Sequence, residues 1–358
     1  SDVYKRQLLY LGSNTHIIIL KKRVNNMRIG IPRALLYQYY YPLWRSLFEN
    51  LGFEVVISDK SSKSLVQKGI AVTVPEICLP IKIFDGHVIN LMEKGVDYIF
   101  CPRFVHIEKG YWFCPKYIGL PELVEKTIPS ARLIVAEIDC RRNDTADLKC
   151  YMPIAKKLNI PAHRMKAALK AAAADFEKFR GYCRRGLTLD EAAMVLFDKI
   201  PIKNFEVPKY DITIGLLGYI YNVYDPFISM EIIKKLREMK VRIITFDMMT
   251  DEELLKYRHT NTRPIFWTFA DRLYQAAHVM IKDKGVDGLI HITAFGCGPD
   301  SVVGKEIEHD FADSGVPFMT LRIDEHTGES HLQTRIEAFT DMIKRKKYHL
   351  KKKAEVTE

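Results

Sequence analysis

Three cysteines stand in turn sequences, far apart along the chain. They are Cys78 in Val-Pro-Glu-Ile-Cys-Leu-Pro, Cys114 in Trp-Phe-Cys-Pro-Lys and Cys297 in Ala-Phe-Gly-Cys-Gly-Pro. Each is expected at the mouth of a strand-to-helix turn, where a thiolate is available to hold a soft metal centre. If the three converge, they form an iron–sulfur redox centre. Three protein ligands would leave one iron of a four-iron cluster open to a small ligand.

Other interpretations of the cysteines stay open. Free cysteine is among the most buried residue types, so each thiol has simple core packing as its alternative. Structural zinc sites favour Cys-x-x-Cys pairs, which this chain lacks, so zinc fits the spacing less well. Cys101, in Phe-Cys-Pro-Arg, is expected to be a fourth ligand or a thiol that contacts the ligands without binding the metal. No function is assigned to Cys140, Cys150 or Cys183.

The elements that must position these cysteines follow from an alternation of β-branched runs and amphipathic stretches that starts at Met27. The pattern predicts strands at 28–32, 53–58, 70–74, 96–101, 132–138, 212–217, 241–246, 288–293 and 317–322. It predicts helices at 34–51, 81–94, 228–239, 264–284, 301–314 and 330–346, and two or three more within 150–200. Strands separated by helices pair in parallel, so the fold class is α/β.

The same alternation divides the chain into five parts. They are a non-native or disordered leader (1–26), an N-terminal α/β domain (27–140), a helical insert (141–209), a C-terminal α/β domain (210–346) and a basic disordered tail (347–358). Sites in open parallel sheets form beyond the carboxyl ends of the strands. We therefore expect Cys78 and Cys114 to face Cys297 across a cleft between the two α/β domains.

Composition narrows the classes of function. The chain has 358 residues and seven cysteines, an odd number that argues against a disulfide framework and for the cytoplasm. No apolar run is long enough to span a bilayer, so no membrane partner is expected. The net charge of +10 comes mainly from the two ends and forms no basic stripe with aromatic residues. Nucleic acid is therefore not an expected partner.

One further segment concentrates charge after the last predicted strand. Asp324-Glu325-His326-Thr327-Gly328-Glu329 places three carboxylates around a histidine. Such a loop is suited to bind a hard cation or to relay protons. The alternative is a charged loop that caps the following helix.

Five stretches carry a resemblance to a known group of proteins. They are Arg28-Ile-Gly-Ile-Pro-Arg-Ala-Leu-Leu-Tyr, the segments around Cys78, Cys114 and Cys297, and Arg322-Ile-Asp-Glu-His-Thr-Gly-Glu-Ser. Together they resemble an uncharacterised activase-associated family related to the D-component of 2-hydroxyacyl-CoA dehydratases. The resemblance implies two flavodoxin-like parallel-sheet domains joined by a helical insert. It also implies a [4Fe-4S] cluster held by Cys78, Cys114 and Cys297.

The resemblance further implies an oxygen-sensitive electron-transfer protein. Its partner would be an ATP-hydrolysing, actin-like activase with its own iron–sulfur cluster, and its chemistry a lyase or reductase reaction on an acyl-CoA or another small molecule. The dehydratases work as paired subunits, so this chain is expected as a homodimer or heteromer. Leu217-Gly-Tyr219 lacks the acidic residue that relatives often carry there, which weighs against CoA-thioester chemistry. A double-cubane cluster ranks lower because three of the seven cysteines lie outside turns.

Two alternatives from other functional classes remain. One is a non-catalytic subunit that docks an activase or scaffolds a larger reductase. The other is a ligand-binding α/β protein with packed, metal-free cysteines.

Overall fold

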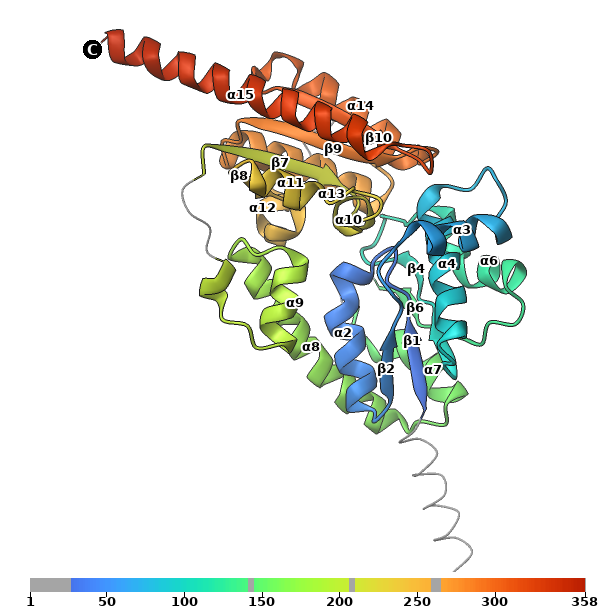
Figure 1. Cartoon of the computed structure of the whole chain (residues 1–358). Coiled ribbons are helices and arrows are strands. Elements are labelled where there is room, and N and C mark those ends of the chain that lie inside the picture. The colour runs from blue at the N-terminus through green and yellow to red at the C-terminus, as the bar shows by residue number, and fades with distance from the viewer. Residues whose placement is uncertain (1–26, 141–144, 206–209, 259–264, 358) are drawn as a thin grey trace, which may run out of the picture.

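The computed structural model describes residues 27–140, 145–205, 210–258 and 265–357, and it contains two α/β lobes (Figure 1). The leader at 1–26 lies outside the described residues. Each lobe is built around a parallel sheet of four strands. None of the helices in the described parts of the chain combines the length and hydropathy needed to cross a bilayer.

The N-terminal lobe has a sheet in the order β2-β1-β3-β5. Its strands are β1 (Arg28–Ile31), β2 (Glu54–Ile57), β3 (Tyr98–Phe100) and β5 (Leu133–Ile134). Its helices are α2 (Tyr37–Asn50), α3 (Lys63–Val72), α4 (Leu79–Glu93), α5 (Pro115–Ile118) and α6 (Leu120–Thr127). The interiors of β1 and β3 are apolar and fully buried, as expected for strands covered on both faces.

Two strands of this lobe continue beyond a bend. β4 (Arg103–His106) and β6 (Glu137–Asp139) form a separate two-stranded parallel sheet, where the sequence had predicted a single strand at 132–138. Pro102 interrupts the hydrogen bonding because proline has no backbone N–H. The flanking residues keep theirs: Cys101 donates to the Ile134 carbonyl at 2.9 Å and Arg103 to the Ala136 carbonyl at 2.8 Å.

Helices link the two lobes, as the composition of 150–200 predicted. They are α7 (Leu148–Lys157), α8 (Ala162–Arg184), α9 (Leu189–Phe197) and the 3₁₀ turn η1 (Ile202–Phe205). The long helix α8 packs along α2 through aromatic contacts, with Tyr40 stacked on Phe176 at 5.6 Å between ring centroids. The helical segment is therefore attached to the N-terminal lobe.

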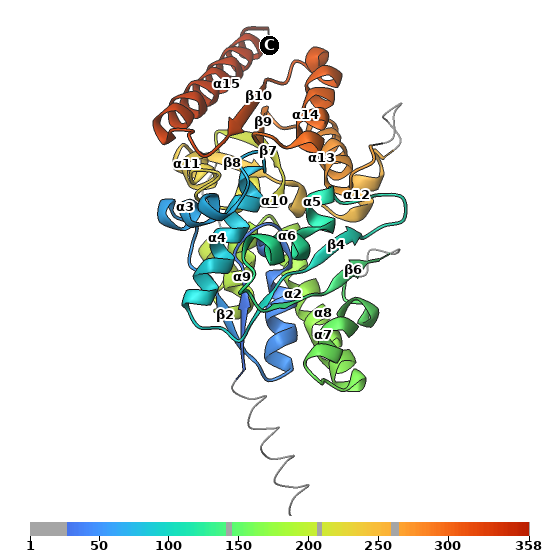
Figure 2. The same ribbon diagram turned by 90° about the vertical axis from the view of Figure 1, so that its right-hand side faces the viewer.

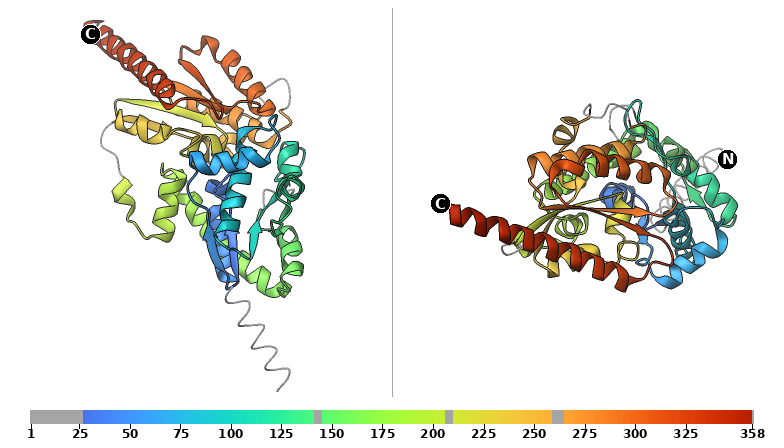
Figure 3. Two further views of the ribbon diagram at one scale, coloured as in Figure 1. Left: turned by 45° about the vertical axis from the view of Figure 1, so that its right-hand side comes forward. Right: turned by 90° about the horizontal axis from the view of Figure 1, so that it is seen from above.

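The C-terminal lobe repeats the architecture, with a sheet in the order β10-β9-β7-β8. Its strands are β7 (Ile212–Gly218), β8 (Val241–Ile244), β9 (Gly288–Ala294) and β10 (Phe318–Ile323). Its helical elements are α10 (Ile220–Tyr224), α11 (Ile232–Glu238), η2 (Phe246–Met248), α12 (Asp251–Leu255), α13 (Thr268–His278), η3 (Val279–Asp283), α14 (Gly298–Asp310), η4 (Ala312–Ser314) and α15 (Glu329–Thr357). α13 and α14 lie on one face of the sheet, α11 and α15 on the other (Figure 3).

These observations confirm the α/β class, with two parallel-sheet lobes and helices between them. In both sheets the first strand lies between the second and third strands of its lobe. The C-terminal lobe sits over the ends of β1 and β3, with α10 and the start of α4 at the junction (Figure 2). The exact domain boundaries stay a prediction.

Two predicted elements were wrong. The strand at 70–74 is the end of helix α3 and the turn after it. The side chain of Ser62 accepts a hydrogen bond from the Leu65 N–H and caps this helix, and tertiary packing against α4 outweighs the β-branched composition. The basic segment at 347–357 was predicted to be disordered, but it belongs to α15.

The crossing of α3 and α4 depends on glycine. A Cβ added at Gly69 would lie 1.8 Å from the Lys82 carbonyl oxygen, and one at Gly86 would lie 2.3 Å from the Leu65 carbonyl oxygen. Both contacts are with backbone, which cannot move without separating the helices. Because α4 begins directly after Cys78, this close crossing also fixes the position of that cysteine.

We expect Gly69→Ala to destabilise the protein by at least about 1–3 kcal/mol, because the added methyl group overpacks a backbone contact. Gly181→Ala, within α8, is the matched control, since a Cβ there meets nothing within 4 Å. That change should be neutral or stabilising by up to about 1 kcal/mol. Urea denaturation of the two variants measures the difference, and equal midpoints would contradict the tight crossing.

Candidate metal centre

Each of the three predicted cysteines is the N-cap of a helix. Cys78 precedes α4, Cys114 precedes α5 and Cys297 precedes α14, all with extended backbone. Every one of these helices has proline in its first two positions, a residue that favours helix initiation. In two of these helices the cysteine sulfur accepts from the first turn: the N–H groups of Lys116 and Tyr117 act on Cys114, and that of Asp300 acts on Cys297.

The structure brings these three thiols together between the lobes. The charges of Cys78 and Cys114 both influence the pKa of Cys297, and all three cysteines influence the pKa of Tyr117. They are also the three partly exposed cysteines of the chain, whereas the other four are buried. Cys297 follows β9, as predicted, but Cys78 is reached from helix α3 and not from a strand.

Burial opposes ionisation of the thiols in the absence of a metal. It raises the pKa of Cys114, while hydrogen bonds from the backbone of Tyr117 and Lys116 act in the opposite direction. Burial also raises the pKa of Cys297, and the nearby Asp300 adds to the effect while its backbone N–H opposes it. Burial thus favours the thiol forms of Cys114 and Cys297, which would release their protons if a metal bound.

Three buried tyrosines line the same space, and sequence reasoning missed them. They are Tyr117 in α5, Tyr219 and Tyr221, and burial raises the pKa of each well above its usual value. The Tyr117 ring lies 6.5 Å from that of Tyr221, and the Tyr221 ring 5.7 Å from that of Tyr219. The buried Tyr117 hydroxyl forms no hydrogen bond of regular geometry. The Tyr221 side chain nevertheless lies close enough to lower its pKa through a weaker hydrogen-bonding contact.

A glycine at the end of β7 directs two of these tyrosines into the site. Gly218 has a φ of 156°, and a Cβ there would lie 2.7 Å from the Ile292 carbonyl oxygen. The chain turns at this point so that Tyr219 begins α10 and Tyr221 follows within it. A glycine directly after a buried strand was the one sequence signal for this turn.

A buried polar network lies behind Cys297. Asp300, in the first turn of α14, accepts hydrogen bonds from His291 Nε2 at 2.9 Å and from Asn222 Nδ2 at 3.4 Å. Asp300 and His291 are both almost completely inaccessible to solvent. The network connects β9, α10 and α14, so it fixes the start of the helix that follows Cys297. Sequence analysis gave no role to His291 or Asn222.

The three thiols do not form a ready-made site for a single metal ion. Within the described residues, no three His, Cys, Asp or Glu side chains are gathered closely enough to hold one metal ion. Tetrahedral zinc would hold its thiolates about 2.3 Å from the metal, with the sulfurs nearly touching. An iron–sulfur cluster would place several atoms between its thiolates, so it would require a wider arrangement of the same ligands.

Two other predicted features take different places. Cys101 is fully buried at the end of β3, and its pKa is raised by burial and by the charge of Asp85. The carboxylates of the loop at 324–329 have partners within the protein. Asp324 accepts from the backbone N–H of His326 at 2.9 Å, and Glu325 and Glu329 pair with lysines. The role of this loop stays a prediction.

Contacts between the two lobes hold the cysteine turns in position. Lys82, four residues after Cys78, pairs with Glu325 after β10 at 2.8 Å. Trp112, two residues before Cys114, forms a backbone bridge with the C-terminal lobe. Its N–H donates to the Phe266 carbonyl at 3.1 Å, and its carbonyl accepts from the Thr268 N–H at 2.9 Å. Each contact lies beside one of the cysteine turns.

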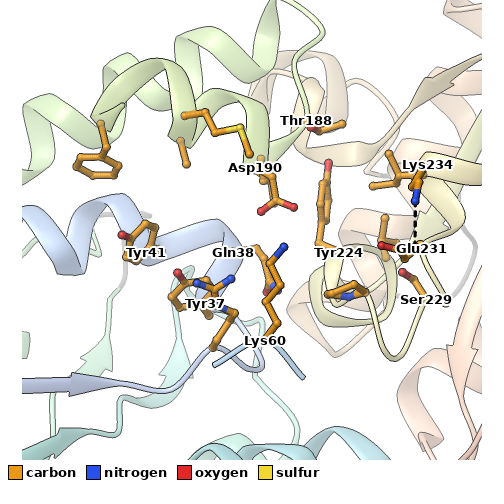
Figure 4. Close-up of a pocket in the computed structure, with 18 of the residues that line it drawn as sticks. Tyr37, Gln38, Tyr41, Lys60, Thr188, Asp190, Tyr224, Ser229, Glu231 and Lys234 are labelled. Atoms are coloured by element: carbon orange, nitrogen blue, oxygen red, sulfur yellow. Dashed lines mark ion pairs between the residues drawn. The ribbon is translucent and has the colours of Figure 1, made fainter. Parts of the chain in front are cut away.

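Two cavities adjoin at the junction of the lobes and the helical segment. The first has a volume of about 360 Å³, and Gln38, Asp190 and Tyr224 face its interior (Figure 4). The second has a volume of about 430 Å³ and includes Leu79, the residue after Cys78. Lys60 lines both, so the two cavities adjoin and are together called the interlobe groove, although neither lining includes a cysteine.

The fold and the site together define a two-lobed α/β protein with a thiol-lined centre between its lobes. Residues 28–249, more than half of the chain, match the model of the CoA enzyme activase uncharacterised domain (DUF2229), and the chain belongs to that family. Residues 214–343 are similar to the 2-hydroxyglutaryl-CoA dehydratase D-component. A comparison with curated proteins found no match. Cys78 and Cys114 lie in the first matched region and Cys297 in the second.

We expect Lys82→Met to destabilise the protein by about 2–3 kcal/mol, because it leaves the Glu325 carboxylate without its partner. Only 4 % of Lys82 is exposed, while Glu325 keeps some contact with water, which holds the cost below that of a fully buried pair. Lys68→Met breaks the exposed Lys68–Glu93 pair and is the matched control, with an expected effect of at most about 1 kcal/mol. Thermal unfolding of both variants measures the two effects. A smaller loss for Lys82→Met than for the control would contradict a stabilising role of the Lys82–Glu325 pair between the lobes.

Proposed function

We propose that Cys78, Cys114 and Cys297 hold a [4Fe-4S] cluster that accepts low-potential electrons from an ATP-dependent activase. The cluster would supply single electrons for a reductive or dehydration reaction on a small molecule. The proposal is supported by the N-cap positions of the three cysteines, two from one lobe and one from the other, and by the influence of Cys78 and Cys114 on the pKa of Cys297. Similarity to the 2-hydroxyglutaryl-CoA dehydratase D-component supports the same class of chemistry.

The residues of the chain have separate roles in this proposal. The helix N-termini stabilise thiolate ligands, and the three buried tyrosines keep bulk water from the centre. Tyr117 lies within electrostatic reach of all three cysteines, so its hydroxyl would be a candidate hydrogen-bond donor to a group bound there.

The interlobe groove supports a small-molecule substrate. Arg33 and Lys60 line it and form no ion pair among the described residues, so they are available to an anionic group. Gln38 is 6 % exposed, and its carbonyl oxygen has no hydrogen-bond partner in the protein. Asp190 is exposed to solvent and lines the same groove beside Arg33 and Lys60. The groove therefore combines cationic groups with hydrogen-bond acceptors, as an acyl-CoA or another polar acid requires.

The surface around the cysteines supports docking of an electron donor. Phe295, two residues before Cys297, is 69 % exposed, and Phe266 and Trp112 are also exposed beside the Cys114 turn. Large apolar side chains gathered at a redox centre are typical of a protein interface. The partner proposed for this surface is the actin-like activase with its own iron–sulfur cluster. All seven cysteines are thiols, which supports a reducing compartment such as the cytoplasm.

Anaerobic purification of the full chain tests the cluster. We expect a brown protein with about four irons and four labile sulfides per chain, since three thiolates and one open iron complete a four-iron cluster. Cys114→Ser should lose most of this iron because a hydroxyl is a poor ligand for it. Cys183→Ala is the matched control, since Cys183 is buried in α8, and it should keep the iron. A colourless, correctly folded wild-type protein would contradict the proposal and favour a metal-free ligand-binding protein.

Phe295→Glu tests the docking surface. We expect it to slow ATP-dependent reduction of the cluster by the actin-like activase of the same organism at least about tenfold, because a charge replaces an apolar contact at the interface centre. Reduction by dithionite should stay unchanged, which separates docking from loss of the cluster. Met342→Glu, an exposed apolar position on α15, is the matched control. Equal reduction rates for the two variants would contradict docking of the activase at Phe295.

A further inference from the structure

Two further cysteines, which lie outside the three N-cap turns, are in contact with each other. The sulfurs of Cys140 and Cys150 are 3.5 Å apart, within hydrogen-bonding distance for thiols. Both residues are buried, with 5 % and 4 % of their surfaces exposed. Neither lies within the three cysteine turns, and the proposed cluster uses neither of them. The contact is therefore a separate feature of the N-terminal lobe.

We propose that Cys140 and Cys150 form a reversible disulfide when the protein meets a peroxide. The sulfurs need to approach by roughly 1.5 Å to reach the bonded distance of about 2.05 Å, which a small change of side-chain torsion provides. Ten residues separate the two cysteines, and both are anchored in regular structure: Cys140 directly after β6, and Cys150 in the first turn of α7. The Cys140 N–H also donates to the His106 carbonyl at 2.8 Å, which holds its backbone in place.

Cys150 is the better nucleophile of the pair. It is the third residue of α7, where the helix dipole favours a negative charge. The Cys140 thiol donates a hydrogen bond that lowers the pKa of Cys150, and a backbone hydrogen bond from Asp139 acts in the same direction, while the charges of Asp147 and Asp139 oppose them. Asp147, the N-cap three residues before Cys150, is exposed, so the start of α7 reaches the surface.

The chemistry balances with a single peroxide. The Cys150 thiolate attacks one oxygen, the O–O bond breaks, and hydroxide leaves to give a sulfenic acid. The Cys140 sulfur then attacks the Cys150 sulfur, the S–O bond breaks, and the departing hydroxide takes up the thiol proton as water. The net change is two thiols and one hydrogen peroxide converted into one disulfide and two waters. A small dithiol such as dithiothreitol returns both thiols by exchange.

Peptide mapping of the full chain tests this site without relying on the cluster. Anaerobically purified protein is treated with hydrogen peroxide, blocked with N-ethylmaleimide and digested under non-reducing conditions. We expect one cross-linked peptide pair that joins Cys140 to Cys150, and its loss after dithiothreitol. Damage to an iron–sulfur cluster would instead expose Cys78, Cys114 and Cys297 to the blocking reagent, so the two events are read from different peptides.

Two variants sharpen the test. Cys150→Ser should abolish the cross-link and leave Cys140 alkylated, whereas Cys183→Ala should keep the cross-link, because Cys183 lies in α8 outside the pair. The oxidised wild-type protein should also unfold at a higher temperature than the reduced protein, since the cross-link restricts the unfolded chain. Wild-type protein in which both cysteines stay fully alkylatable after peroxide treatment would overturn the proposal. So would overoxidation of Cys150 to a sulfinic acid without any cross-link.

Discussion

The contact between the two lobes determines the geometry of the candidate centre. Cys78 and Cys114 come from one parallel sheet lobe and Cys297 from the other, so no local segment could bring them together. The Lys82–Glu325 pair and the backbone bridge at Trp112 lie beside two of the three cysteine turns. These contacts fix where the helix N-termini point, and the helices in turn fix the thiols. The chemistry of the site therefore depends on packing between elements that are remote in the sequence.

The electrostatics of the centre balance two opposing effects. Burial favours neutral thiols, as the raised pKa values of Cys114 and Cys297 indicate, while the ends of three helices favour negative charge. The proposed cluster would resolve this opposition, since it would bind thiolates and distribute their charge. The three buried tyrosines limit access of water to the same region.

The sequence predicted the architecture better than it predicted the surroundings of the three cysteines. The alternation of β-branched and amphipathic stretches was sufficient for most strands and helices, because buried parallel strands and amphipathic helices have distinct periods. It failed at 70–74, where β-branched residues form the end of a helix. The Ser62 cap and the close packing of Gly69 against α4 stabilise that helix. Tyr117, Tyr219 and His291 were missed because their roles come from tertiary neighbours and not from a motif. Cys140 and Cys150 were missed for the same reason, since a spacing of ten residues carries no signal of contact.

The most direct test of the central claim is an anomalous diffraction map at the iron absorption edge, from crystals grown without oxygen. The account predicts one compact group of iron peaks between the lobes, within bonding distance of the sulfurs of Cys78, Cys114 and Cys297. Iron bound at any other cysteine, or an iron-free map in which the Cys297 sulfur points away from the other two, would contradict it.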